Sequence, residues 1–406
     1  MRTIFILIVC FVFQTVYSQD KDSLLVKKQH INFKKTITEV VITGQLTEKL
    51  AEDAIHKIRV INSQTINSGI FQDLGSLLEK ELNIRLSNDN MLGTNISIQA
   101  ISGQNVKILI DDVPVIGRLN GNIDLSQINL NNIERIEIVE GPLSTIFGTD
   151  ALAGTINIIT KKDISYKKSF STYYESIGKY NYDLILSNQF KRNLLIYQFG
   201  RDYFNGWSDG QEFKLIPVRE IANDSRNKLW NPKEKFRHKL SYNIRESNYT
   251  INNHIETFYE KIINLGLPRE PYFENAFDEY YHTYRTNFGS NININNKKDQ
   301  VKILLAYNRY KRVKETFYTD LTEISKILVA DQNAQDTTYF NTLLAKMIMS
   351  NNQDGRLKYQ IGIDLQYHTV GGQRILSKYQ EQSDFAFFST IEYKLNSLIF
   401  IRPSAR

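Results

Sequence analysis

Cysteine and proline are scarce in this sequence of 406 residues, which contains one Cys and 7 Pro. A single Cys cannot form an intramolecular disulfide framework or a four-Cys metal site. The mean hydropathy of −0.37 argues against a bundle of membrane helices, and only one stretch approaches the length of a helical span. The composition therefore points away from both disulfide scaffolds and helical membrane proteins.

Motifs of common catalytic and metal sites are also lacking. The six histidines show no H-E-x-x-H or similar ligand spacing. The glycine-rich segment 141–154 lacks the spacing of a phosphate-binding loop. The net charge is +6, but no basic run with interleaved aromatic residues indicates a nucleic-acid partner. We therefore expect no enzymatic activity, no catalytic residue, no metal site, no cofactor and no nucleic-acid partner.

Aromatic residues are abundant, with 23 Tyr and 22 Phe. The apolar fraction of 41% is too high for a disordered chain. Because aromatic and β-branched residues favour strands, the composition predicts a large β protein.

The N-terminus has the pattern of a secretory signal peptide. Met1 and Arg2 precede an apolar run from Ile4 to Val16, and the predicted cleavage site follows Ser18. A membrane anchor is the alternative, but a run of about 13 residues is short for a bilayer core. With residues 1–18 removed, the exported chain has no Cys, because the single Cys lies inside the apolar run.

Residues 19–45 are polar and lysine-containing, and they end in a short β-prone segment. This segment consists of Thr38, Glu39, Val40, Val41, Ile42, Thr43 and Gly44. It is either the first strand of the next domain or an extended peptide that pairs with the edge of a partner's sheet. The sequence leaves both readings open.

Residues 46–162 are predicted to form a compact α+β unit. Leucines at three- and four-residue spacing predict a helix over 70–81, capped by Ser68. A second helix is expected over 126–132. Strands are expected over 96–101, 106–110, 135–139 and 155–160. Clustered glycines between the last two strands indicate tight turns and close backbone approach.

From residue 163 onward the apolar residues alternate with polar ones at period two. Over 359–367 an apolar face is bounded by a tyrosine at each end, which is typical of a transmembrane β-strand with aromatic girdles and a polar lumen. A soluble sandwich is the alternative, but its strands are usually shorter. The predicted strands cover 168–178, 181–191, 193–204, 235–246, 248–261, 279–293, 299–312, 337–350, 355–370 and 383–394, with another beginning at Ser397.

The connections between these strands alternate between short and mostly long. Outer-membrane barrels have short periplasmic turns and longer external loops, so the first strand is expected to rise from the periplasm. His254 and His368 then face the lumen. We interpret them as ordinary polar lumen residues rather than haem contacts. An exported barrel with a basic pI also meets lipid and anionic lipopolysaccharide in the outer membrane.

Residues 38–45 and 58–161 resemble the TonB-dependent outer-membrane receptors, first their TonB box and then their plug domain. The segment Lys107–Asp111 is similar to one conserved strand of the plug. The densest match is Ile133-Glu134-Arg135-Ile136-Glu137-Ile138-Val139-Glu140-Gly141-Pro142, followed by Phe147-Gly148, Ala151, Gly154 and Ile156-Asn157-Ile158-Ile159-Thr160.

The resemblance implies an α+β plug domain inside an antiparallel transmembrane β-barrel of 22 strands, energised by TonB. Thr38–Gly44 would be the TonB-binding segment. We also expect polar contacts between plug and barrel wall through Arg135, Glu137 and Glu140. The plug-motif residues implied by the match are Asp111, Glu137, Glu140, Gly141, Pro142, Gly148, Gly154 and Asn157.

The ligand implied by the resemblance is a ferric siderophore or another iron complex, with cobalamin, haem and oligosaccharide left open. A passive porin is disfavoured, because it would have neither plug nor TonB box. External loops carry recognition. Their aromatic residues Trp207, Trp230, Tyr272 and Phe273 are the candidate ligand contacts.

Length gives a last expectation. The predicted plug ends at residue 162, which leaves 406 − 162 = 244 residues for the barrel. These hold ten predicted strands and the start of an eleventh, about half of the wall that the resemblance implies. We expect residues 163–406 to be a partial barrel whose C-terminal half is missing.

Overall fold

The computed structural model describes residues 40–41, 43, 49–50, 57–69, 71, 73–81, 84–89, 93–98, 101–117, 123–141, 143–162, 168–208, 226, 228–296, 298–351, 355–396 and 399–406. The predicted signal peptide and the leader up to residue 39 lie outside these ranges. None of the helices within them combines the length and the apolar character that a membrane span requires.

A five-stranded mixed sheet forms the centre of the plug, in the order β3-β9-β10-β7-β8. Its central strand, β10, pairs antiparallel with β9 and parallel with β7, so that Ile156 lies between Ile138 and Ile108. The predictions of strands at 106–110, 135–139 and 155–160 are confirmed. The strands are β3 (Lys57–Asn62), β7 (Val106–Ile110), β8 (Val113–Pro114), β9 (Ile133–Glu140) and β10 (Gly154–Thr160).

Two smaller sheets and several short helices complete this part of the chain. One sheet has the order β4-β5-β6, and the other pairs β1 with β2. Their bounds are β1 (Val40–Val41), β2 (Lys49–Leu50), β4 (Ile84–Asp89), β5 (Gly93–Ile98) and β6 (Ile101–Ser102). The helices are α2 (Ser63–Ser68), α3 (Leu74–Leu78) and α4 (Ser144–Phe147), with 3₁₀ turns at η2 (Gly103–Asn105), η3 (Leu125–Gln127) and η4 (Thr149–Ala151).

The helix predicted over 70–81 is shorter than expected. It is α3, and its cap is Asp73 rather than Ser68, which instead ends α2. The Asp73 carboxylate accepts the Ser76 backbone N–H at 2.9 Å, and the Ser76 hydroxyl accepts the Asp73 N–H at 3.2 Å. This reciprocal capping box satisfies backbone donors that a helix starting earlier would leave unpaired.

Two other predictions in the plug needed correction. The strand predicted over 96–101 is displaced, because β5 ends at Ile98 and β6 begins at Ile101. The helix predicted over 126–132 is the single 3₁₀ turn η3, in which Asp124 caps the Ser126 N–H. Asn129 then forms a β-bridge with Asp73, so the chain extends where the helix would have continued.

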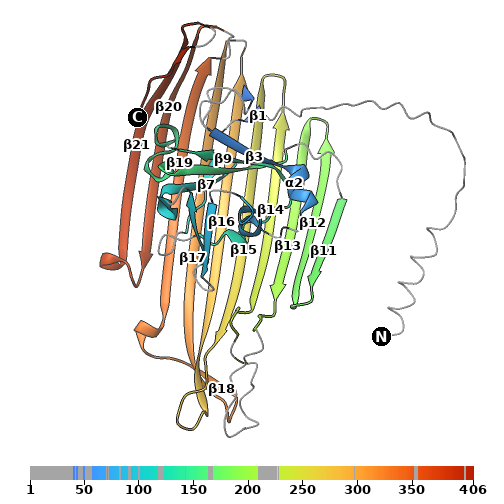
Figure 1. Ribbon diagram of the computed structural model, residues 1–406, viewed down its shortest axis with the longest axis vertical. Coiled ribbons are helices and arrows are strands. Elements are labelled where there is room, and N and C mark those ends of the chain that lie inside the picture. The colour runs from blue at the N-terminus through green and yellow to red at the C-terminus, as the bar shows by residue number, and fades with distance from the viewer. Residues whose placement is uncertain are drawn as a thin grey trace, which may run out of the picture. The chain divides into compact units, whose positions relative to one another are not determined.

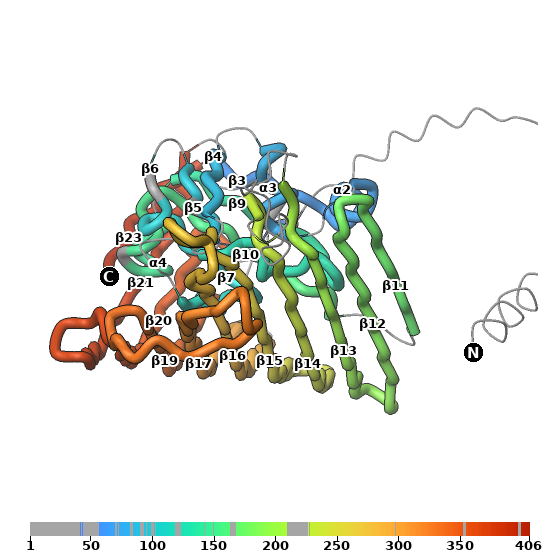
Figure 2. Tube along the Cα trace, turned by 90° about the horizontal axis from the view of Figure 1, so that it is seen from below, coloured from blue at the N-terminus to red at the C-terminus, as the bar shows by residue number. Residues whose placement is uncertain are grey.

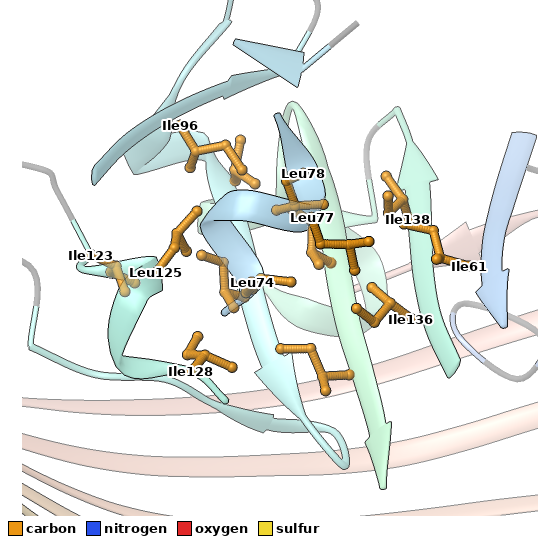
Figure 3. Packing of buried hydrophobic residues seen from close by; sticks show 14 of the residues in the cluster. Ile61, Leu74, Leu77, Leu78, Ile96, Ile123, Leu125, Ile128, Ile136 and Ile138 are labelled. Carbon is orange, nitrogen blue, oxygen red and sulfur yellow. The ribbon is translucent and has the colours of Figure 1, made fainter. Parts of the chain in front are cut away.

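The plug core lies between α3 and the central sheet. Leu74 and Leu78 are fully buried, as is Ile136 of β9, and Figure 3 shows the α3 leucines packed against the sheet. Full burial of one such side chain contributes about 1.5–3 kcal/mol. The apolar stripe that predicted the helix therefore also anchors it.

The barrel wall is one antiparallel sheet whose long strands are neighbours in chain order, as Figures 1 and 2 show. All ten predicted strands are confirmed as elements. They are β11 (Lys168–Glu175), β12 (Lys179–Phe190), β13 (Asn193–Phe204), β14 (Lys233–Arg245), β15 (Tyr249–Leu265), β16 (Asn275–Asn295), β17 (Asp299–Asp320), β19 (Asp336–Asn351), β20 (Leu357–Gly372) and β21 (Tyr379–Lys394). Shorter strands are β18 (Ser325–Leu328), β22 (Phe400–Ile401) and β23 (Ser404–Ala405).

The two faces of this wall differ as the alternation predicts. On β20, Ile361 and Leu365 are exposed, whereas Gln360 and Asp364 between and beside them are buried. The apolar face suits lipid and the polar face suits the lumen. Three of the long connections differ from their predictions, because the strands beside them extend farther than expected. The loops expected over 262–278, 313–336 and 371–382 shrink to 266–274, 321–335 and 373–378, and the second of them contains β18.

Candidate functional site

The predicted TonB-binding segment lies against the plug where the structure describes it. Val40–Val41 forms β1 and pairs antiparallel with β2. Val41 and Thr43 are buried, with Thr43 1% exposed. The other members of the segment, Thr38, Glu39, Ile42 and Gly44, lie outside the described residues. The described part is therefore held by the plug rather than extended away from it.

Thr43 bonds to the two central strands of the plug. Its backbone N–H donates to Glu137 Oε2 on β9 at 2.7 Å. Its hydroxyl accepts a hydrogen bond from Asn157 Nδ2 on β10 at 3.0 Å. Glu137 is fully buried, and its other oxygen accepts the Arg135 Nε–H at 2.7 Å. A buried carboxylate with a charged partner is costly to leave unpaired, so these bonds define one arrangement of the segment.

The same network continues from Asn157 to the barrel wall. Asn157 Nδ2 also donates to Asp112 Oδ1 at 2.8 Å, and its own Oδ1 accepts the Asp112 N–H at 3.3 Å. The second carboxylate oxygen of Asp112 accepts a hydrogen bond from Lys302 on β17. A continuous polar chain of Thr43, Asn157, Asp112 and Lys302 thus leads from the predicted TonB-binding segment to the wall.

Lys302 also determines the charge state of Asp112. Burial disfavours the charged carboxyl, but the adjacent Lys302 ammonium outweighs this, so the pKa of Asp112 lies below its ordinary value of 3.8. The plug end of the ion pair is therefore ionised at neutral pH.

Asp111 shapes the turn between β7 and β8. It has φ 50°, as Asp112 has φ 69°, and such left-handed positions are tolerated best by Gly, Asn and Asp. Its carboxylate accepts the Thr160 N–H at 3.1 Å and the Thr160 hydroxyl at 2.6 Å. Burial opposes ionisation of Asp111, but Lys162 and Lys239 favour it and its pKa is lowered. The turn is thus locked to the end of β10.

The glycines of the plug motif occupy positions that other residues tolerate poorly. Gly148 has φ 86° and Gly141 has φ 103°. At Gly154, with φ 152°, a Cβ would lie 2.4 Å from the Val139 carbonyl oxygen. These values explain why the motif has glycine there. Pro142 lies outside the described residues.

Glu140 bonds to residues of the plug itself. Its carboxylate pairs with Lys57 at 2.9 Å and with Arg59 at 3.5 Å. Arg135 and Glu137 are hydrogen-bonded to each other on β9. All three residues that we expected to contact the wall therefore form hydrogen bonds within the plug sheet. Glu137 also interacts electrostatically with the Lys302 ammonium of β17 in the wall.

Polar side chains of the wall reach backbone and side-chain groups of the plug. Such pairs are Lys235 with Ser126, Gln127 with Glu260 and Arg285, Asn291 with Asp111, Asn308 with Pro114, Lys346 with Ile146, and Arg245 with Lys162. An apolar contact joins Val113 to Leu304, Ala306 and Leu344. Inward position on an alternating strand was the only sequence signal for these contacts.

The four candidate ligand contacts lie in two places. Trp207 and Trp230 exchange backbone hydrogen bonds of 2.9 Å and are both exposed. Tyr272 is exposed in the connection between β15 and β16, where Phe273 packs against Ala276. Within the ranges that the structure describes, no cluster of three or more His, Cys, Asp and Glu side chains is suited to hold a metal ion.

Comparison with known proteins places these features in a family. The family model of the TonB-dependent receptor plug domain matches residues 51–155. The vitamin B12 transporter BtuB of Vibrio cholerae is 28% identical over 134 residues, which cover 32% of this chain and 22% of that protein. The iron-regulated outer membrane virulence protein of the same species is 32% identical over 136 residues, which cover 32% and 21%.

The ferric enterobactin receptor of Pseudomonas aeruginosa has a similar fold, with a TM-score of 0.67 at 15% identity. The match covers 90% of this chain and 58% of the receptor. The chain thus matches about a fifth of the length of its curated relatives. The plug match, the relatives and the shared fold agree: the chain belongs to the TonB-dependent receptors of the outer membrane, with a plug domain and antiparallel strands of the barrel wall.

Proposed function

We propose that the protein imports a scarce compound across the outer membrane and is energised by TonB. The observation that carries this proposal is the bonding of Thr43 to Glu137 and Asn157. A pull on the segment that contains Thr43 would act directly on β9 and β10, the central strands of the plug. A passive porin has no use for such a connection.

The coupling step that we propose is strand exchange. β1 pairs with β2 through only two residue pairs, and an isolated two-stranded ribbon is marginally stable in water. An extended segment of Val and Thr can instead add to the edge of a partner's sheet, where backbone hydrogen bonds provide affinity. TonB is the partner, and Thr38–Gly44 is the segment that binds it.

We infer that the imported compound is a ferric siderophore or another iron complex. Names of similar proteins support this class: one relative is described as iron-regulated, and the solved receptor with a similar fold binds ferric enterobactin. Other names support the alternatives, since BtuB is a vitamin B12 transporter and OprC is a copper transporter. Haem and oligosaccharide also stay open as ligands.

Growth under iron limitation tests this substrate class. A deletion strain and its parent are supplied singly with ferric enterobactin, ferric citrate, haemin and other iron sources, and with cyanocobalamin in a separate test of cobalamin dependence. We expect the deletion strain to lose growth on one iron source and to keep growth on the rest. Equal growth of both strains on every iron source would exclude the iron complex.

A groove on the outward face of the wall supports lipopolysaccharide as a lipid partner. It has a volume of about 700 Å³, and its lining includes Tyr284, Arg309 and Lys311 together with one carboxylate, that of Glu315. Arg309 and Lys311 follow the outward, exposed Tyr307 along β17, so they lie just beyond the apolar band. Among the described residues no ion pair engages either cation. The phosphate groups of the outer leaflet carry the opposite charge to these two cations and lie at the same level of the membrane.

The double substitution Arg309→Ala and Lys311→Ala should weaken lipopolysaccharide binding. Each cation at a membrane surface contributes about 1 kcal/mol, so the affinity should fall by roughly 30-fold. Phosphate assay of co-purified lipid measures this. The matched control replaces Arg192 and Lys298, which lie in short connections at the opposite end of the strands. An equal loss in both variants would refute a specific site.

A further inference from the structure

A buried carboxylate lies at the end of the wall that carries the long connections. It belongs to Asp278 of β16, which shares one face of that strand with Tyr284 and Phe288 because side chains alternate along a strand. The two aromatic residues are exposed, whereas Asp278 is 0% exposed. Because a buried charge is costly without partners, the groups that cover Asp278 show what the site holds together.

The first partner is Arg226, from the connection between β13 and β14. Its guanidinium donates to Asp278 Oδ1, and its Nε–H donates to the Gly266 carbonyl at 3.0 Å. The Arg226 side chain is 11% exposed, so water screens this ion pair little. A charged pair with a further hydrogen bond also fixes geometry. Arg226 therefore joins its own connection to the β15–β16 hairpin.

The hairpin of β17 and β18 supplies the other partners, and β18 lies at this end of the wall in Figure 1. Thr319 Oγ1 donates to Asp278 Oδ2 at 2.7 Å, and Lys326 Nζ lies 3.6 Å from the same oxygen. Thr319 and Lys326 are themselves paired across β17 and β18. The Lys326 ammonium also lies 4.9 Å from the centre of the Tyr280 ring. We call Asp278 and its partners Arg226, Thr319 and Lys326 the external latch.

The external latch holds the segment that carries Trp230. Arg226 precedes Trp230 and is fixed on β16 by the latch. After Trp230, the Pro232 carbonyl accepts the Ile263 N–H of β15 at 3.0 Å. Trp230 is thus tied on both sides, and its backbone exchanges hydrogen bonds with Trp207. The position of both exposed tryptophans, which are candidate ligand contacts, therefore depends on the latch.

We propose that Asp278 is a positioning residue for ligand recognition. It joins three hairpins into one preassembled surface that presents Trp207 and Trp230 to the imported compound. A preassembled surface loses less conformational freedom on binding than separate loops do. The inference rests on the proposed function, because it assigns how the ligand contacts of that function are held. Loss of the latch should therefore weaken binding and leave the later, energised step intact.

The substitution Asp278→Asn tests this role, because it keeps the volume and one acceptor oxygen but removes the charge. Uptake is measured over a range of concentrations with whichever of ferric enterobactin, ferric citrate, haemin or cyanocobalamin the growth test identifies. We expect the half-saturating concentration to rise about ten-fold, because apparent affinity falls with the fraction of receptors in the competent arrangement. The maximal rate per receptor, with receptor quantified by immunoblot, should be unchanged. A defect in folding or insertion would instead reduce the amount of receptor and keep the half-saturating concentration.

A second variant and a matched control separate the latch from a general effect of charge. Arg226→Gln removes the same ion pair, so it should act like Asp278→Asn, and the double variant should show no further change. The control is Asp320→Asn, because Asp320 accepts hydrogen bonds from Thr322 and Glu323 of its own turn. It should leave the half-saturating concentration unchanged. An unchanged value for Asp278→Asn, an equal rise in the control, or additive single effects would overturn the proposal.

Trypsin treatment of intact cells gives a readout that needs no imported compound. Trypsin cleaves after Arg and Lys, and a side chain held in the latch cannot enter its active site. Cleavage after Arg226, identified by mass spectrometry, should be faster in Asp278→Asn than in the parent receptor. Cleavage after Lys378, which is exposed between β20 and β21, should be equal in both. Equal cleavage after Arg226 would contradict the latch.

Failure of the two proposals can be told apart. Uptake that does not depend on TonB refutes the proposed function. TonB-dependent uptake with the same half-saturating concentration in the parent and in Asp278→Asn refutes only the positioning role.

Discussion

Deletion of Thr38–Gly44 should abolish uptake while leaving binding at the cell surface unchanged. The deletion removes Thr43 and with it the bonds to Glu137 and Asn157, and it removes the segment proposed to pair with TonB. We predict that recognition takes place at the external loops, at the other ends of the wall strands, so affinity for the compound should persist. Parallel assays of cell-surface binding and of accumulation inside the cell measure the two effects.

A deletion of the same length in the leader serves as the control. Residues 22–28 lie outside the predicted TonB-binding segment and after the predicted signal peptide. Their removal shortens the leader by the same number of residues. Because Thr38–Gly44 is kept, uptake should persist. Unchanged uptake without Thr38–Gly44, or loss of binding together with uptake, would refute the coupling role.

The substitution Glu137→Ala should have the largest effect on plug stability. Glu137 is fully buried and accepts hydrogen bonds from Thr43 and Arg135. Removing one partner of a buried charged pair costs about 3–5 kcal/mol. In this variant Arg135 keeps, among the described residues, only its pair with the half-exposed Glu134, and the buried Thr43 N–H loses its acceptor. Amide hydrogen exchange of the whole receptor should therefore show faster exchange at Thr43 and along β9.

Glu134 supplies the matched control on the same strand. Its side chain is 47% exposed and pairs with Arg135 at 2.5 Å. Exposed pairs contribute about 0–1 kcal/mol, so Glu134→Ala should leave exchange almost unchanged. Glu137→Gln keeps the volume and one acceptor, and its effect should lie between the two. Similar exchange in the Glu134→Ala and Glu137→Ala variants would contradict the role of the buried carboxylate.

The wall strands were predictable because one physical pattern determines them. A strand between lipid and a polar lumen must alternate, and the alternation of Ile361 and Leu365 with Asp364 is visible in the sequence. The ends of the strands were harder to place. The pairing of β20 with β21 continues through Gly371 and Tyr379, beyond the segment in which apolar and polar residues alternate. Backbone hydrogen bonds between neighbouring strands do not require alternating side chains.

The plug was less predictable, because its short elements depend on tertiary contacts. β3 was not predicted, and its pairing with β9 through Ile61 and Ile136 is a long-range contact. The extended chain after η3 depends on the bridge between Asp73 and Asn129. Local propensity carries no information about partners so distant in sequence.

The candidate site was predictable only in part. The predicted TonB-binding segment and Asn157 could be identified from the resemblance to the family, but nothing in the sequence indicated that Asn157 and Thr43 are hydrogen-bonded. The partners of the plug at the wall, such as Lys302 and Lys346, look like any other inward polar residues. Only the register of β17 and β19 brings these two lysines to the plug.

Dependence of uptake on TonB tests the central claim most directly. Cells that produce the receptor, with and without TonB, are given the radiolabelled compound that the growth test identifies, and accumulation inside the cell is followed over time. We predict accumulation only in cells with TonB, while surface binding is equal in both. Equal accumulation in the two strains would contradict energised transport and favour passive entry.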